Sequence, residues 1–150
     1  MAKEIEKKFL LKRGSSIPIP EGYSRFKIKQ GYVFAEKDKQ VRVRLIGKKS
    51  LLTIKFTDDI VRDEFEYSIP LSDGKEIYAK CELKIEKDRL SFNGDNEHYD
   101  IDSFSNGMVF VEVEFKSIKD MNKWVKPSWI GEEITGVEEY SNIYLAKTIV

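Results

Sequence analysis

Residues 40–46 read Gln-Val-Arg-Val-Arg-Leu-Ile, in which polar and apolar side chains alternate as far as Leu45. Successive side chains of a β-strand point to opposite faces of its sheet, so the alternation predicts a strand with one apolar face. The other face carries Arg42 and Arg44, two positive charges at positions i and i+2. This placement of like charges side by side on one strand face is the feature from which the fold is argued.

The same placement recurs along the chain, with two charges of one sign at i and i+2 and mostly apolar residues between them. The further pairs are Glu4/Glu6 (continued by Lys8), Glu64/Glu66, Lys87/Arg89, Asp100/Asp102 and Glu112/Glu114. Any one pair alone fits an ordinary solvated strand face. Like charges close together repel, however, and a solvated face usually mixes signs with neutral polar residues. The recurrence therefore favours a face with a specific function.

Extended segments of this kind dominate the chain. The expected strands cover residues 3–11, 26–35, 40–46, 51–56, 62–69, 80–91, 98–104 and 108–115. Ser72 or Asp73 is expected to cap a short helix through Tyr78, and residues 117–125 and 138–146 have helical character. Short strands at near-regular spacing with helices mostly late predict a mainly β, α+β fold: a largely antiparallel sheet or barrel in one domain, residues 1–150.

Composition narrows the functional classes. The 150 residues include 26 Lys+Arg and 26 Asp+Glu, so the formal net charge is zero. This balance argues against a nucleic-acid or membrane partner bound through bulk charge. The apolar content of 41% is too high for a disordered chain. The single cysteine, Cys81, excludes an internal disulfide and a cysteine metal site. The first residues contain no apolar secretory signal, and no run approaches the roughly 20 apolar residues of a membrane helix, so we expect a cytoplasmic protein.

The charged strand faces allow two interpretations. In an ordinary β domain they are solvated. In a closed barrel they would point into the lumen, where charges must be paired or must bind ions. Carboxylates there would suit Mg²⁺ or Mn²⁺, and arginines and lysines would suit a polyanion such as a polyphosphate.

The strand at residues 80–91 leaves one point open. Lys87 and Arg89 share parity with Cys81, Leu83 and Ile85. Either a β-bulge resets the register, or this face changes from apolar packing to charged lumen along its length.

The charged motifs resemble, in order, the signature of the CYTH superfamily, the triphosphate tunnel metalloenzymes. Glu4-Ile-Glu6-Lys-Lys8 resembles the N-terminal ExExK motif. The further similarities are Gln30-Gly-Tyr32 with a second-strand segment, Arg42-Val-Arg44 with an RxR pair, Thr53-Ile-Lys55 with a lysine strand, residues 62–66 with an acidic strand, residues 86–89 with a KxR strand, residues 111–115 with an ExE strand, and residues 129–135 and 140–146 with the C-terminal segment. The resemblance covers residues 4 to about 146, nearly the whole chain.

This resemblance implies an eight-stranded antiparallel β-barrel that forms a tunnel, with a few peripheral helices. It also implies Mg²⁺ or Mn²⁺ as cofactor and a triphosphate-containing small molecule as partner; a homodimer stays open. Known activities of the family are inorganic triphosphatase, thiamine triphosphatase, RNA triphosphatase and class IV adenylyl cyclase. The short bacterial inorganic triphosphatases are the most similar. A class IV-type cyclase, a thiamine triphosphatase and a non-catalytic polyphosphate or nucleotide binder are the alternatives.

The resemblance also assigns roles to residues. The expected phosphate ligands are Lys8, Arg42, Arg44, Lys55, Lys87 and Arg89. The expected metal ligands, partly through waters, are Glu4, Glu6, Glu64, Glu66, Asp100, Asp102, Glu112 and Glu114. Lys8 with Tyr32 corresponds to a proposed activating pair of the short bacterial members. Two departures from the family pattern lie outside its core signature. Asp100 and Asp102 lie in a strand that often begins with Glu, and Leu90 stands where a Tyr often follows the KxR pair.

The remaining conspicuous residues are expected to have structural roles. His98 is interpreted as a surface residue near a turn, and Cys81 as a packed side chain. Trp124 and Trp129 are expected to dock the late helix on the barrel. The segment from Tyr140 to Leu145 has the alternative role of closing one tunnel mouth.

Overall fold

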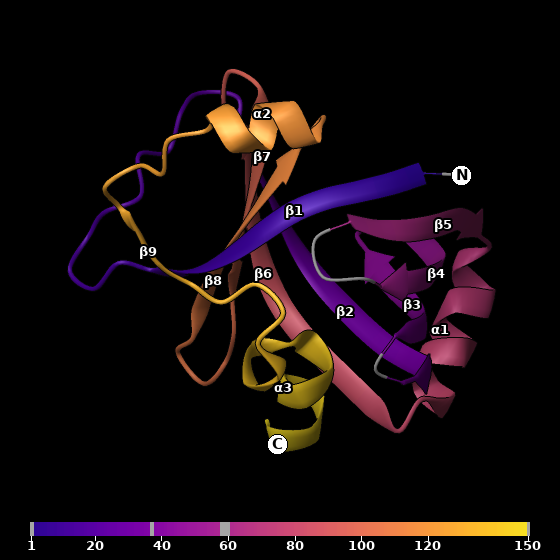
Figure 1. The fold of residues 1–150 in the computed structure, drawn as a ribbon. Coiled ribbons are helices and arrows are strands. Elements are labelled where there is room, and N and C mark those ends of the chain that lie inside the picture. Colours follow the sequence, from indigo (N-terminus) through magenta and orange to yellow (C-terminus); the bar gives the residue numbers. More distant parts are fainter. Residues whose placement is uncertain (1, 37, 58–60, 150) are drawn as a thin grey trace.

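The computed structural model, which describes residues 2–36, 38–57 and 61–149, is built around one antiparallel sheet that closes on itself (Figure 1). Closure occurs because β1 pairs with β8 on one side and with β5 on the other. The strands are β1 (Ala2–Leu11), β2 (Ser24–Ala35), β3 (Lys39–Ile46), β4 (Lys49–Thr57), β5 (Val61–Ile69), β6 (Leu83–Asn93), β7 (Glu97–Ser103), β8 (Val109–Phe115) and β9 (Ile130–Glu133). Eight of them form the ring, and β9 adds to β1 beyond the part that pairs with β5. The predicted eight-stranded antiparallel barrel is confirmed.

The strand register turns the like-charged pairs toward the lumen. Glu112 on β8 lies opposite Lys8 on β1 and Asp100 on β7. On the other side of the ring, Arg42 lies opposite Tyr32 and Thr53. Because side chains opposite each other share a face, these residues belong to one continuous inner surface.

The lumen face of β6 changes character along its length. β6 pairs with β2 and β7 in an unbroken register, so no bulge lies within these pairings. Ile85 joins a small apolar core with Tyr32, Phe104 and Phe110, and Lys87 follows on the same face. Of the two alternatives, the gradual change from apolar to charged is the one observed.

The C-terminal segment packs against this apolar end. It contains a 3-10 turn, η1 (Glu138–Tyr140), and helix α3 (Asn142–Thr148). The ring of Tyr140 meets Phe110 edge-on at 5.7 Å, and Leu145 is buried in the same core. The segment thus covers one end of the lumen, the alternative noted for residues 140–145, while α2 (Ile118–Lys123) lies at the opposite end of the molecule (Figure 1).

A second and larger core lies outside the barrel. Phe9, Val111 and Phe115 on the outer faces of β1 and β8 pack against α2 and the segment that follows it. Trp124 contacts Phe9 and Phe115 at ring-centroid distances of 5.5 and 5.4 Å, and Trp129 is buried in the same cluster. The predicted docking role of the two tryptophans is confirmed.

Several element boundaries differ from those predicted. Helix α1 (Leu71–Lys80) begins after Pro70, which has φ −54° and no side-chain cap, so neither Ser72 nor Asp73 is the N-cap. Because α1 runs to Lys80, β6 starts at Leu83 rather than at residue 80. The expected helix over 138–146 is divided by Ser141, whose hydroxyl caps α3 by accepting from the Tyr144 N–H. Strand β9 was not predicted from the sequence, because it forms only by pairing with β1, which is distant in the chain.

None of the helices in the described ranges combines the length and the apolar character needed to cross a membrane.

Gly74 lets α1 lie close to the outside of β4 and of β3, the strand that carries Arg42 and Arg44. A Cβ atom at this position would overlap Ser50 Oγ and lie 2.6 Å from Ser50 Cβ. Alanine normally stabilises a helix interior by about 1 kcal/mol relative to glycine. Here we expect Gly74→Ala to lower the free energy of unfolding by about 1–3 kcal/mol in urea denaturation, because the overlap forces the helix outward. Adding Ser50→Gly should recover part of this loss, and a stabilised single variant would contradict the packing.

Candidate active site

The arginines of β3 form a positive wall of the lumen. Arg42 and Arg44 are both buried. Neither has a carboxylate within ion-pair distance in the part of the chain that the structure describes, and Arg42 Nε is buried with no hydrogen-bond partner there. Burial, with repulsion from Arg42 and Arg89, lowers the pKa of Arg44 to about 9, which leaves it charged at neutral pH. Two enclosed guanidinium groups without counter-ions form a site suited to an anion.

A short hydrogen-bond chain fixes the direction of Arg44. Its Nε donates to Gln30 Oε1 at 2.7 Å, and Gln30 Nε2 donates to the Tyr32 hydroxyl at 3.1 Å. Gln30 is completely buried, so this neutral pair orients the guanidinium without cancelling its charge.

A second group of positive charges, on β6, is paired. Asp102 on β7 is inaccessible to solvent and contacts Lys87 Nζ at 2.8 Å. It also accepts two hydrogen bonds from Arg89, at 2.7 and 2.9 Å. Burial would raise the pKa of Asp102, but Lys87 and Arg89 hold it well below its usual range. Both oxygens of Asp102 are therefore engaged by cations, and its geometry is that of a counter-ion that orients Lys87 and Arg89.

Carboxylates gather on the opposite side, on β1 and β8. Glu4, Glu6 and Glu114 each offer an oxygen, and the three oxygens lie within 4.8 Å of one another. Burial, with repulsion from Glu112 and Glu4, raises the pKa of Glu6 to about 8, although Lys55 and Arg62 oppose the rise. Crowded carboxylate oxygens are the donor set that Mg²⁺ and Mn²⁺ prefer, so these residues fit such an ion.

Two cations on neighbouring strands balance part of this negative charge. Lys55 Nζ lies 3.1 Å from Glu4 Oε1 and 3.4 Å from Glu64 Oε2. Arg62 Nη1 lies 2.7 Å from Glu6 Oε1 and 3.7 Å from Glu4 Oε1. Glu66, farther along β5, accepts a hydrogen bond from the Thr53 hydroxyl at 3.2 Å.

Lys8 and Tyr32 both face the lumen near its closed end, but no hydrogen bond joins them within the described residues. Lys8 Nζ donates to the backbone oxygen of Tyr140 at 2.6 Å and lies 4.5 Å from the centre of the Phe110 ring. Burial raises the pKa of Tyr32, so its hydroxyl stays protonated at neutral pH. The activating role expected for the pair stays a prediction.

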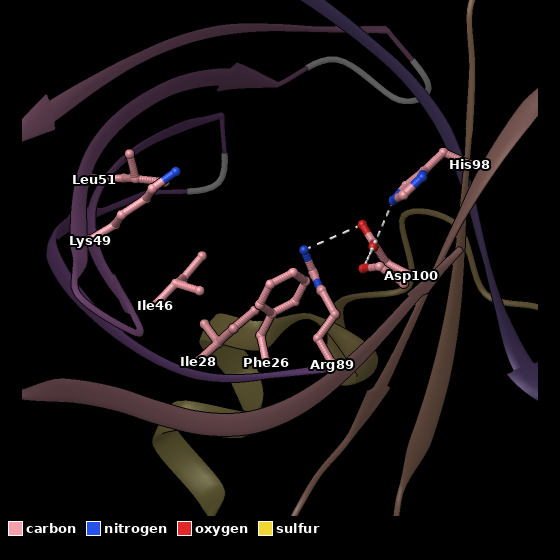
Figure 2. Close-up of a pocket in the computed structure, with 9 residues that line it drawn as sticks. Phe26, Ile28, Ile46, Lys49, Leu51, Arg89, His98 and Asp100 are labelled. Carbon is pink, nitrogen blue, oxygen red and sulfur yellow. Dashed lines mark hydrogen bonds and ion pairs between the residues drawn. The ribbon is translucent and has the colours of Figure 1, made fainter. Parts of the chain in front are cut away.

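The other end of the lumen opens into a cavity of about 360 Å³ with two different sides (Figure 2). Apolar side chains come from three strands: Phe26 and Ile28 of β2, Ile46 of β3 and Leu51 of β4. Lys49 lies near Leu51 and Arg89 lies beside Phe26, while His98 and Asp100 lie across the cavity from Leu51.

His98 belongs to this polar side of the cavity, and its side chain remains 38% exposed. Its Nε2 lies 3.0 Å from Asp100 Oδ1, and its Nδ1 lies 2.7 Å from Asn93 Oδ1. The hydrogen bond to Asp100 raises the pKa of His98. The alternation of β7 places His98 on the face of Asp100 and Asp102, a signal in the sequence that the adjacent turn obscured.

Several polar residues that line the lumen were not predicted as site residues from the sequence. Arg62 and Gln30 lie on predicted strands with inward parity, so alternation alone could have identified them. Asn142 could not be found in this way: its Oδ1 accepts from Lys87 Nζ at 2.9 Å only because α3 folds back over the end of the barrel.

The chain is similar to known proteins in both sequence and structure. The profile of the CYTH domain matches residues 2–144. An inorganic triphosphatase of Acetivibrio thermocellus is 39% identical over 153 residues, covering 98% of this chain and 95% of that protein. An inorganic triphosphatase of Nitrosomonas europaea is 30% identical over 152 residues, covering 97% and 98%.

Solved structures of other proteins share the fold of this chain. The crystal structure of an inorganic triphosphatase superposes with a TM-score of 0.67 at 28% identity, covering 97% of this chain and 95% of that one. A Pyrococcus horikoshii protein, at 19% identity and a TM-score of 0.63, shares the fold over 79% of this chain and 82% of its own.

The counter-ion role of Asp102 can be separated from metal binding by stability measurements in a chelator. Asp102→Asn leaves Lys87 and Arg89 buried without their shared anion, so we expect a loss of about 3–5 kcal/mol in the free energy of unfolding. Glu114→Gln is the control, because Glu114 is the exposed member of the carboxylate cluster, and partial burial with repulsion from Glu4 and Asp100 already raises its pKa. That control should lose no stability in urea denaturation. Equal losses in both variants would contradict this division of roles.

Glu6 should make the metal-free protein less stable as the pH rises. Its pKa is about 8 in the folded state against an ordinary value of 4.5. Between these values the unfolded chain releases a proton that the folded protein keeps, so the free energy of unfolding falls, by a few kcal/mol, as the pH passes from about 5 to 8. Glu6→Gln should flatten this part of a stability-against-pH profile in chelator. An unchanged slope would contradict the raised pKa.

Proposed function

The chain belongs to the CYTH domain family, and we propose that it hydrolyses inorganic triphosphate to pyrophosphate and phosphate inside the barrel, with a divalent metal ion. Two relatives that align with nearly the whole chain are inorganic triphosphatases, which supports this substrate. The lumen also supports it, since it brings together the cations and the carboxylates that the reaction needs.

The observation that carries the proposal is the unequal pairing of the enclosed charges. Arg42 and Arg44 lack carboxylate partners in the described part of the chain, while Glu4, Glu6 and Glu114 crowd together on other strands. Either arrangement alone leaves charge without compensation. A metal triphosphate would offset both, because its oxygens suit the guanidinium groups and its cation suits the carboxylates.

Glu4, Glu6 and Glu114 are the residues that would hold Mg²⁺ or Mn²⁺. Such an ion, when bound, neutralises phosphate charge and lowers the pKa of a bound water. The remaining acidic residues with inward parity, among them Glu64, Glu66 and Glu112, would hold a second ion or the attacking water. Burial raises the pKa of Glu64, which brings that carboxylate closer to the range of a general base.

The cations would hold the substrate during the reaction. Arg42, Arg44 and Lys55 would bind phosphate oxygens from one side, and Lys87 and Arg89 from the other. Their combined effect is to fix the triphosphate for in-line attack by water and to stabilise the charge that develops on the leaving pyrophosphate. Lys8, between the acidic residues of β1 and the closed end, would bind the phosphate that reaches deepest.

A second candidate substrate is a triphosphate that carries an organic group, such as thiamine triphosphate. The apolar side of the open cavity favours it, because Phe26, Ile28 and Leu51 would contact an apolar group but offer nothing to a phosphate.

Phosphate release from inorganic triphosphate, thiamine triphosphate and ATP, with Mg²⁺ and with Mn²⁺, tests these proposals, with cyclic AMP measured in parallel. We expect inorganic triphosphate to be hydrolysed fastest and a chelator to abolish the reaction. Preference for thiamine triphosphate would select the second candidate, and cyclic AMP would select a cyclase. No turnover on any substrate would contradict catalysis and leave a binding protein.

Arg42→Met should reduce kcat/KM for inorganic triphosphate at least about 100-fold, because a buried charge facing the phosphates is lost. Thermal unfolding should show that the barrel persists. Arg25→Met is the matched control: Arg25 is an exposed arginine on β2, and its variant should keep wild-type kcat/KM. If Arg42→Met retained full activity, the positive wall would have no role in the reaction.

A further inference from the structure

Arg62 stands at the start of β5 with its guanidinium in the carboxylate cluster. Its Nη1 lies 2.7 Å from Glu6 Oε1, the shortest ion pair among the described contacts of that cluster, and 3.7 Å from Glu4 Oε1. Glu6 is nine-tenths buried, so this contact is largely shielded from water. Neither the residue pattern nor the relatives assign a role to Arg62.

The contact with Glu6 satisfies Arg62 only in part. Arg62 Nε is buried and has no hydrogen-bond partner among the described atoms. A guanidinium that were purely structural would be expected to have its buried donors paired. Arg62 therefore has a strong partner at one nitrogen and an unused donor at another.

The same carboxylate oxygens serve two kinds of cation. Glu4, Glu6 and Glu114 fit a divalent ion, which would draw on the same Glu6 carboxylate that Arg62 contacts. The two positive charges would also repel each other across a few ångströms in an enclosed site. A divalent ion and Arg62 therefore compete for the negative charge of Glu6.

We propose that Arg62 is the internal counter-ion of the carboxylate cluster, that a divalent cation displaces it from Glu6, and that Arg62 thereby sets the metal affinity of the site. The inference rests on the metal site of the proposed function. Arg62 is a positioning residue in this role: in the metal-free barrel it keeps the carboxylates of Glu4 and Glu6 together, and it lowers metal affinity by the free energy of that contact. Lys55 differs, because it contacts Glu4 and Glu64 but not Glu6.

Direct Mn²⁺ binding without substrate tests the proposal. Free Mn²⁺ is measured by electron paramagnetic resonance at about pH 8, where protons compete less for Glu6. We expect Arg62→Met to bind Mn²⁺ at least tenfold more tightly than the wild type, and to unfold at lower temperature in chelator but not in excess Mn²⁺. Arg62→Lys keeps the charge and should stay within about threefold of the wild-type Kd.

Arg44→Met is the matched control, since it removes one enclosed positive charge that contacts Gln30 and no cluster carboxylate. Its Kd for Mn²⁺ should change by less than about threefold. The proposal is overturned if Arg62→Met binds Mn²⁺ no more tightly than the wild type, or if Arg44→Met tightens binding equally. Failure of the wild type itself to bind Mn²⁺ would remove the metal site, and the proposed function with it.

A measurement on the wild type avoids dependence on how Arg62→Met folds. The Nε–H resonances of the arginines are followed by nuclear magnetic resonance during Mg²⁺ titration, with Arg62 assigned from Arg62→Lys. The Arg62 resonance should shift with Mg²⁺ occupancy, while that of Arg44, bonded to Gln30, should move much less. A stationary Arg62 resonance at saturating Mg²⁺ would overturn displacement.

Discussion

Closing the sheet removes one face of every strand from bulk water, and each charge on that face must then be compensated inside the lumen. This constraint explains why the inner surface is a network of ion pairs and hydrogen bonds rather than a set of independent side chains. Asp102, whose two oxygens are held by Lys87 and Arg89, shows compensation within the chain. The end covered by Tyr140 and Leu145 shows the other solution, in which apolar side chains fill the lumen and the Lys8 ammonium is met by the backbone oxygen of Tyr140.

Between these two solutions lies the part of the lumen that the chain leaves unbalanced. Arg42 and Arg44 have no carboxylate within ion-pair distance in the described part of the chain, and Gln30 orients Arg44 without neutralising it. Across the barrel, the crowded carboxylates of Glu4, Glu6 and Glu114 are only partly offset by cations. An excess of each sign, held on different strands, is best offset by a ligand that carries both signs. A metal triphosphate has that composition.

Much of this arrangement could be predicted from alternation alone. Parity placed Arg42, Glu112 and Asp102 on one face, and the recurrence of like-charged pairs indicated that this face was enclosed. Alternation could not identify the ion-pair partner of each charged residue. Those partners depend on the register between strands, which the sequence does not show. Asp102 was therefore grouped with the metal ligands, although Lys87 and Arg89 hold both of its oxygens. Strand β9 and the contact of Asn142 with Lys87 depend on chain segments that meet only after folding.

The most direct test of the account is a crystal structure with Mn²⁺ and inorganic triphosphate bound to a slow variant such as Lys8→Ala, with the metal located by anomalous scattering. The account predicts manganese at Glu4, Glu6 and Glu114 and phosphate oxygens at Arg42 and Arg44, with the triphosphate spanning the lumen between them. Triphosphate bound outside the barrel, or manganese seated between Lys87 and Asp102, would contradict it.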